Sequence, residues 1–192
     1  MNAAPVDLPR YPDAWSAKRL LRRQFRVAHA LLDDAIDRLP IEAVHRCAFG
    51  TNVSSGVRYA QVVLCEDLSV NGVLAAGTPL VFSTWAGRTG LNEMPPIIGT
   101  PDWRAWAHRV RLNLAQLRPY ARAVYASTDA YIAALPEDAF NPARGDGSAC
   151  LLSALLLTLS MRTGEISCLL ALEQGPTTND DGVGHAHPSV TQ

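Results

Sequence analysis

The chain has 192 residues, of which 48% are hydrophobic and 18% charged, and its 17 Lys and Arg against 18 Asp and Glu leave a net charge of -1. This length favours one domain with a single packed core, and the hydrophobic content excludes disorder along the whole chain. The near-neutral balance argues against a dedicated nucleic-acid binder, whose binding face is usually strongly basic.

The cysteines and the apolar runs bear on location. Cys47, Cys65, Cys150 and Cys168 are spaced too widely for any CxxC pair. Residues 1–10 lack the apolar core of a signal peptide. The longest uncharged apolar-rich run, residues 150–161, is shorter than the roughly 20 residues that cross a bilayer. We therefore expect a cytoplasmic protein with reduced thiols and no membrane partner.

Four periodic segments predict helices. Residues 14–39 form the first, because Leu21, Phe25 and Leu32 fall on one apolar stripe and Pro40 ends it. Residues 55–76 form the second; their β-branched content is ambiguous with a strand, but the length of the segment favours helix. This helix follows Ser54 as a candidate N-cap.

The third and fourth helices are longer. Residues 100–135 begin with Thr100 as cap and Pro101 at the first helical position. Pro119 inside this segment predicts a kink or break near Arg118. Residues 148–174 are apolar on nearly all sides over their first half, and Gly175 is a suitable C-terminal cap.

The connection over residues 77–99 decides the topology. A loop of this length is uncommon between neighbouring antiparallel helices, and it fits a crossover that leaves the second and third helices parallel. The sequence therefore predicts an all-α four-helix bundle in the up-down-down-up arrangement, with a long crossover between helices two and three. The bundle is expected over residues 14–175, after an N-terminal extension (1–13) and before a flexible tail (176–192).

Three stretches carry a family resemblance. Residues 61–77 (QVVLCEDLSVNGVLAAG), 85–90 (WAGRTG) and 163–175 (TGEISCLLALEQG) together resemble the DinB/YfiT-like superfamily. The resemblance implies a four-helix bundle with the same up-down-down-up order. It also implies a metalloenzyme or a thiol-dependent transferase or isomerase.

The metal ligands that this resemblance implies are replaced here. The family pattern has two histidines four residues apart on the last helix and a third on helix two, which leaves one open metal position. Thr158 and Arg162 stand at the first two positions, and helix two offers Gln61 but no histidine. Since a guanidinium does not bind a metal ion as an imidazole does, we expect a degenerate site with no metal and no cofactor.

A polar site of different chemistry is expected in its place. Thr158, Arg162 and Glu165 share one face of the last helix at i, i+4 and i+7. On helix two, Gln61 and Cys65 lie one turn apart, and Glu66 or Glu165 would neutralise Arg162. Two interpretations stay open: a polar tie between Arg162 and a glutamate, or a site where Arg162 holds a small carboxylate or phosphate.

The remaining cysteine and histidine candidates are expected to have structural roles. Cys65 reads as a core thiol rather than a nucleophile, because no histidine lies near it in sequence. His29, His45 and His108 are scattered and are expected to be surface or hydrogen-bonded residues. Three functions therefore stay open: a metal-free binding or interaction protein, an enzyme using the Arg162 region, and a structural homodimerisation module.

Helix one has an unusual charge order. Basic residues crowd its start and acidic residues its end (Lys18, Arg19, Arg22, Arg23 and Arg26; Asp33, Asp34 and Asp37). This order opposes the helix dipole. It indicates either a solvated face or antiparallel pairing with the same helix of a second copy in a two-fold homodimer.

Overall fold

A computed structural model describes residues 16–47, 53–96, 100–141 and 147–174. These residues form α1 (Ala17–Asp37), α2 (Ser55–Asp67), α3 (Pro101–Arg109), α4 (Leu114–Ala134) and α5 (Ser148–Gln174), with no β-strand among them. The all-α prediction is therefore confirmed. The expected N-terminal extension (1–13) and flexible tail (176–192) lie outside the described residues.

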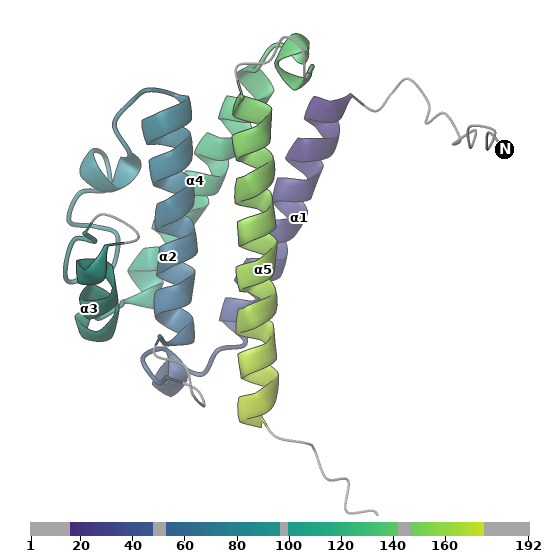
Figure 1. The fold of residues 1–192 in the computed structure, drawn as a ribbon. Helices are drawn as coiled ribbons and strands as arrows, with labels where there is room; N and C mark the ends of the chain where they lie inside the picture. Colours follow the sequence, from purple (N-terminus) through teal and green to yellow (C-terminus); the bar gives the residue numbers. More distant parts are fainter. Residues whose placement is uncertain (1–15, 48–52, 97–99, 142–146, 175–192) are drawn as a thin grey trace, which may run out of the picture.

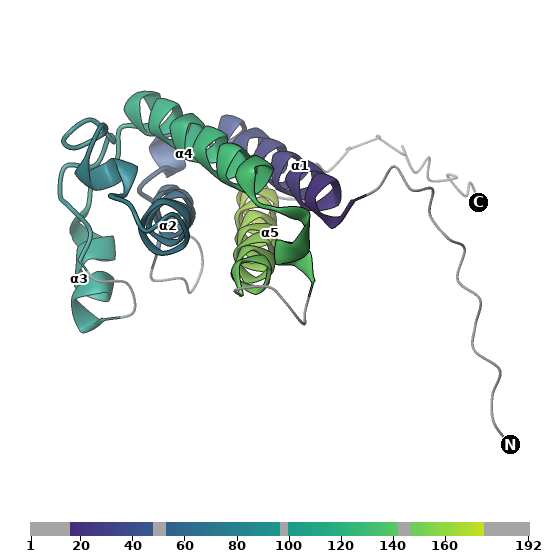
Figure 2. The ribbon, with the colours of Figure 1, turned by 90° about the horizontal axis from the view of Figure 1, so that it is seen from above.

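The four long helices form a two-layer bundle. Figure 2 shows α1 and α4 in one layer and α2 and α5 in the other, with α3 beside α2. In Figure 1, α1 and α5 run in one direction, whereas α2 and α4 run in the opposite one. The up-down-down-up order and the crossover between the parallel helices α2 and α4 are as predicted.

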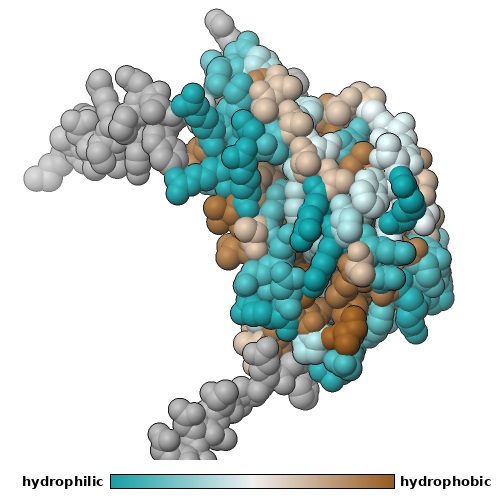
Figure 3. Space-filling view, turned by 180° about the vertical axis from the view of Figure 1, so that it is seen from behind, coloured by the Kyte–Doolittle hydropathy of each residue, from teal (hydrophilic) through white to brown (hydrophobic). Residues whose placement is uncertain are grey.

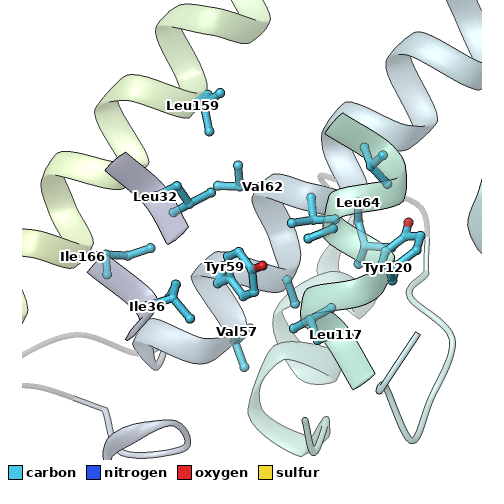
Figure 4. Close-up of a cluster of buried hydrophobic side chains, with 14 of the residues drawn as sticks. Leu32, Ile36, Val57, Tyr59, Val62, Leu64, Leu117, Tyr120, Leu159 and Ile166 are labelled. Carbon is cyan, nitrogen blue, oxygen red and sulfur yellow. The ribbon is translucent and has the colours of Figure 1, made fainter. Parts of the chain in front are cut away.

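The core lies where the apolar stripes of these helices meet. Leu32 and Ile36 of α1 point toward Tyr59 and Val62 of α2 and toward Ile166 of α5 (Figure 4). The start of α1 is stabilised because the Ser16 side chain accepts a hydrogen bond from the backbone N–H of Arg19 at 3.2 Å. The stripe predicted from sequence is therefore the one that α1 buries.

The second helix changes its winding before it ends. Its α-helical part stops at Asp67, and Leu68–Leu74 continue as a π-helix, so the predicted uninterrupted α-helix over 55–76 is corrected. Ala76 then turns the chain with a φ of 50°, and the Gly77 N–H donates to the Asn71 carbonyl at 2.9 Å. π-helical turns are rare and widen the helix locally.

The predicted break near Arg118 is wrong. The chain breaks earlier, between α3 and α4, and α4 runs through Pro119. The crossover fixes this break, because Asn113 N–H donates to the Gly90 carbonyl at 2.8 Å. Gly90 has a φ of 81°, and a Cβ there would lie 2.5 Å from the Asn113 carbonyl oxygen, so only glycine fits this approach. Pro119 lies on the exposed side of α4, in the second turn of the helix.

Candidate functional site

The predicted polar residues of α2 and α5 meet in part. Glu165 on α5 accepts hydrogen bonds from two guanidinium groups: Nη1 of Arg162 lies 3.0 and 2.7 Å from its two carboxylate oxygens, and Nη1 of Arg58 lies 2.7 Å from Oε2. The sequence predicts the pairing of Arg162 with a glutamate but not the contribution of Arg58 on α2. We call Arg58, Arg162 and Glu165, with the neighbouring Cys65, the α2/α5 seam.

This seam ties two helices together and retains a positive charge. Two guanidinium groups share one carboxylate, which leaves a net charge of one. The Arg58 side chain is 17% exposed, and its Nε is buried with no hydrogen-bond partner among the described atoms. Arg162 and Glu165 are each more than a third exposed, so their own pair adds little stability. The contacts match the polar tie expected from the sequence.

Two other predicted residues do not join these contacts. The Thr158 hydroxyl donates to the Ala154 carbonyl of its own helix at 2.9 Å, and its side chain is exposed. Gln61 is half-buried on α2. Neither residue is hydrogen-bonded to the Glu165 carboxylate among the described contacts, so the seam is smaller than the predicted site.

Cys65 lies at the seam as a protonated thiol. Burial raises the pKa of the Cys65 thiol, and the positive charge of Arg162 offsets this only partly. Because the thiolate is the nucleophilic form of cysteine, a raised pKa argues against a catalytic thiol. All four cysteines are free, and Cys47, Cys150 and Cys168 are exposed.

Glu66 lies elsewhere, in a buried network between α1, α2 and α4. Its carboxylate oxygens lie 3.1 and 2.9 Å from Nε2 of His29, and the Thr128 hydroxyl donates to Oε1 at 2.5 Å. The imidazole of His29 stacks on the ring of Tyr125 with centroids 3.8 Å apart. Glu66 therefore contacts His29 and Thr128, and not Arg162 as the sequence predicts. His29 is buried and hydrogen-bonded, whereas His45 and His108 are exposed.

A small cavity of about 270 Å³ opens beside His29 between α1 and α4. Its mouth carries Asp129, which accepts bidentate hydrogen bonds from both Arg22 and Arg26. The hydrogen bonds from Arg22 are the main cause that lowers the pKa of Asp129 to about 2. The cavity is smaller than most ligand pockets, which start near 300 Å³, and these ion pairs occupy its polar groups.

Asp67 secures the crossover with four hydrogen bonds. Its carboxylate is fully buried and accepts from the backbone N–H groups of Leu80 (2.9 Å) and Val81 (2.8 Å). It also accepts from Asn71 Nδ2 at 2.8 Å and from the Tyr120 hydroxyl at 2.7 Å. The two carboxyl oxygens of Asp67 thus each accept two hydrogen bonds. The role of Asp67 is to hold the crossover against α2 and α4.

A larger hollow than the one beside His29 lies between α1 and α5. A groove of about 590 Å³ runs between α1 and α5. Its apolar part is formed by Leu20, Val27, Ala28, Leu31 and Leu156, and its polar part by Arg23, Gln24, Asp34, Arg38, Ser160, Thr163, Gly164 and Ser167. Viewed from behind, the molecular surface shows hydrophobic patches between hydrophilic ridges (Figure 3). We call this hollow the α1/α5 groove.

The α5 helix has exposed apolar side chains in addition to those that it packs into the bundle core. Residues Ser148–Leu172 are long and apolar enough, by length and composition, to cross a membrane. The core helix of a soluble protein meets the same criterion when it is mostly buried, but only 22% of the most apolar stretch of α5 is buried. Leu157, Met161 and Leu172 are each about 60% exposed. The described part of the chain therefore leaves an apolar surface on α5 exposed.

The family resemblance also implies a metal site on the α2 and α5 helices. Within the described ranges, no group of three or more His, Cys, Asp or Glu side chains is arranged to hold a metal ion. Arg162 and Thr158 stand on α5 at the positions where the resemblance implies histidines. The donor set on the α2/α5 face is thus cationic and does not fit a divalent metal.

Comparisons with known proteins bear on the fold alone. No protein-family model matches this chain, and no curated protein matches it. A crystal structure of a conserved protein from Enterococcus faecalis is similar, with a TM-score of 0.69 over 84% of this chain and 99% of that one. The two sequences are 16% identical. The similarity supports the helical architecture, and membership in the DinB/YfiT-like superfamily stays a prediction.

Proposed function

We propose that this protein is a metal-free helical bundle that works by binding a partner protein, whose apolar-faced helix it receives in the α1/α5 groove. The observation that carries the proposal is the uncovered apolar surface of α1 and α5. Leu31 and Val27 on α1 both line the groove and are 56% and 52% exposed, and Leu156 lines it from α5. Apolar surface of this kind is a usual mark of an interaction site when it is contiguous and bordered by polar residues.

The length of the groove favours a helix over a small molecule. On α1 its lining extends from Leu20 to Arg38, which spans about 27 Å at 1.5 Å per residue. A partner helix would place side chains at i, i+3, i+4 and i+7 along such a groove. The polar border formed by Arg23, Ser160 and Ser167 would remain at the edge of that interface.

A protein partner fits this surface better than a lipid bilayer. The middle of α5 carries Arg162 and Glu165, which pair with each other and with Arg58. Burying these charges in a hydrocarbon core would be costly. In addition, α5 contributes Leu159 and Ile166 to the bundle core, so the helix is already committed to one side.

Site-specific photocrosslinking in cells tests this proposal. A benzophenone side chain placed at Leu31 or at Ser160 should give a discrete protein adduct, because both positions are exposed and line the groove. The matched control is Val73, which is apolar and 69% exposed but lies on the π-helical segment. Equal labelling at all three positions, or no adduct at any of them, would contradict a dedicated interface on α1 and α5.

A small anion at the α2/α5 seam is a second candidate, favoured by the net positive charge and by the partnerless Nε of Arg58. A carboxylate or phosphate would bind there by charge-assisted hydrogen bonds. Thermal unfolding with added succinate or inorganic phosphate tests it: both should raise the unfolding temperature of the wild type but not of Arg162→Gln. A variant that is destabilised equally with and without these anions would leave the seam as a structural tie.

A further inference from the structure

The charges along α1 are arranged so that the helix complements a reversed copy of itself. Arg23 and Asp34 both border the α1/α5 groove. They are eleven residues apart, which is close to three helical turns, so they lie on one face about 17 Å apart. Between them Val27 and Leu31 project as exposed apolar side chains, 52% and 56% exposed.

We infer that the helix received by the α1/α5 groove is α1 of a second copy of this chain, lying antiparallel to the first about a two-fold axis near Ala28. This inference rests on the proposed function of the groove. In that arrangement Arg23 of each copy faces Asp34 of the other, because a two-fold interface presents the same patch from both sides. Val27 of one copy packs near Leu31 of its partner.

The shape of the groove fits such packing. The part of α5 that lines the groove projects little into it, because Ser160 and Ser167 have small side chains and Gly164 has none. A Cβ added at Gly164 would meet nothing within 4 Å, so the space above it is open. Leu31 of the second copy has room to enter between α1 and α5, as a knob enters a hole between packed helices.

The charge pairing is compatible with the contacts already present. Asp34 pairs with Arg38 of its own helix at 2.9 Å, and both side chains are exposed. A carboxylate can accept from two guanidinium groups at once, as Asp129 does with Arg22 and Arg26 in this chain. Asp34 can therefore keep Arg38 and also receive Arg23 of the second copy.

The opposite charges of Arg23 and Asp34 favour a second copy of the chain over a membrane surface as the occupant of the α1/α5 groove. An anionic membrane surface would attract Arg23 but repel Asp34, whereas a reversed copy places an opposite charge against each of them. The order of charge along α1 opposes the helix dipole within one chain. Pairing with a reversed helix puts basic and acidic ends together and offsets that cost.

Sedimentation equilibrium over a wide range of protein concentration tests the inference. The wild type should approach twice the chain mass of 20.7 kDa. Leu31→Glu should weaken the dimer at least about tenfold, because it buries a charge near the two-fold axis. Val73→Glu is the matched control, since the Val73 side chain is also apolar and more than half exposed but lies outside the groove. It should leave the dimer unchanged.

A charge exchange tests the predicted register. Arg23→Asp alone and Asp34→Arg alone each create a like-charge pair across the axis and should raise the dissociation constant about tenfold. The double variant restores opposite charges and should return to within about threefold of the wild type. These side chains are exposed, so circular dichroism should show the same helix content in every variant.

The outcomes separate this inference from the function on which it rests. A monomer at every concentration, or a dimer that ignores Leu31→Glu and the charge exchange, overturns the inference. If the chain is a monomer yet position 31 still crosslinks to a different protein, the interaction function stands and the second copy is excluded. Co-flotation of the monomer with phosphatidylglycerol vesicles would overturn both in favour of a membrane surface.

Discussion

Replacing Asp67 by asparagine tests whether the crossover depends on this buried carboxylate. The four donors around it are two backbone N–H groups, the Asn71 amide and the Tyr120 hydroxyl. Asparagine keeps one acceptor oxygen and replaces the other by an NH₂ group. The best arrangement turns this NH₂ toward Tyr120, whose hydroxyl can accept, and leaves the Val81 N–H without a partner.

The expected loss follows from these contacts. A buried donor left unsatisfied costs about 1–3 kcal/mol, and the substitution also forces the Tyr120 hydroxyl to accept a hydrogen bond instead of donating one. We therefore expect Asp67→Asn to lower the free energy of unfolding by about 3 kcal/mol. For a domain of this size that corresponds to a fall of roughly 6–12 °C in the unfolding temperature.

Urea unfolding and limited trypsin digestion measure this loss globally and locally. Arg88 lies in the exposed part of the crossover and should be cleaved faster in Asp67→Asn, because the loop opens more often. Tyr120→Phe removes one donor only and should cost about 1 kcal/mol. Asp138→Asn, an exposed carboxylate, controls for the change in charge. Equal urea midpoints for the Asp67 and Asp138 variants would refute this account of the crossover.

Three further changes test other contacts. Ala76→Gly should raise the free energy of unfolding by about 0.5 kcal/mol, since a φ of 50° is unfavourable for alanine; a lower urea midpoint would contradict this. Gly56→Ala should lower it by about 1–3 kcal/mol, because the new Cβ would lie 2.5 Å from the Val44 carbonyl oxygen. In Asp129→Asn the lost ion pairs should reduce stability at neutral pH, and the difference from wild type should vanish as the pH falls from about 4 through about 2, the lowered pKa of Asp129. A difference that stayed constant with pH would show that charge is not its cause.

The sequence predicts helices and same-helix contacts well, because these follow from local spacing. Leu32 and Ile36 fall on the stripe that α1 buries, and Arg162 meets Glu165 one turn away on the same helix. The long crossover also follows from loop length, since parallel helices require one. The break at Pro119 was wrongly predicted, because contacts of the crossover with Asn113 decide where α4 begins.

Contacts between residues far apart in the sequence cannot be predicted from local spacing. Arg58 and Glu165 are 107 residues apart, and His29 and Glu66 are 37 apart, so only the packing of the helices brings them together. One signal was available in the sequence. Asp67 follows Val63 by four residues and precedes Val70 by three, which places an acidic residue on an apolar stripe and marks it as a buried group with partners.

The hydrogen bonds of Asp67 also imply an order of assembly during synthesis. Leu80 and Val81 follow Asp67 by only 13 and 14 residues, whereas Tyr120 follows it by 53. A nascent chain emerges from its N-terminal end, and closing a short loop is entropically cheaper than closing a long one. The aspartate can therefore fold the crossover back on α2 before α4 has left the ribosome, so that Tyr120 arrives at a template already shaped to receive it.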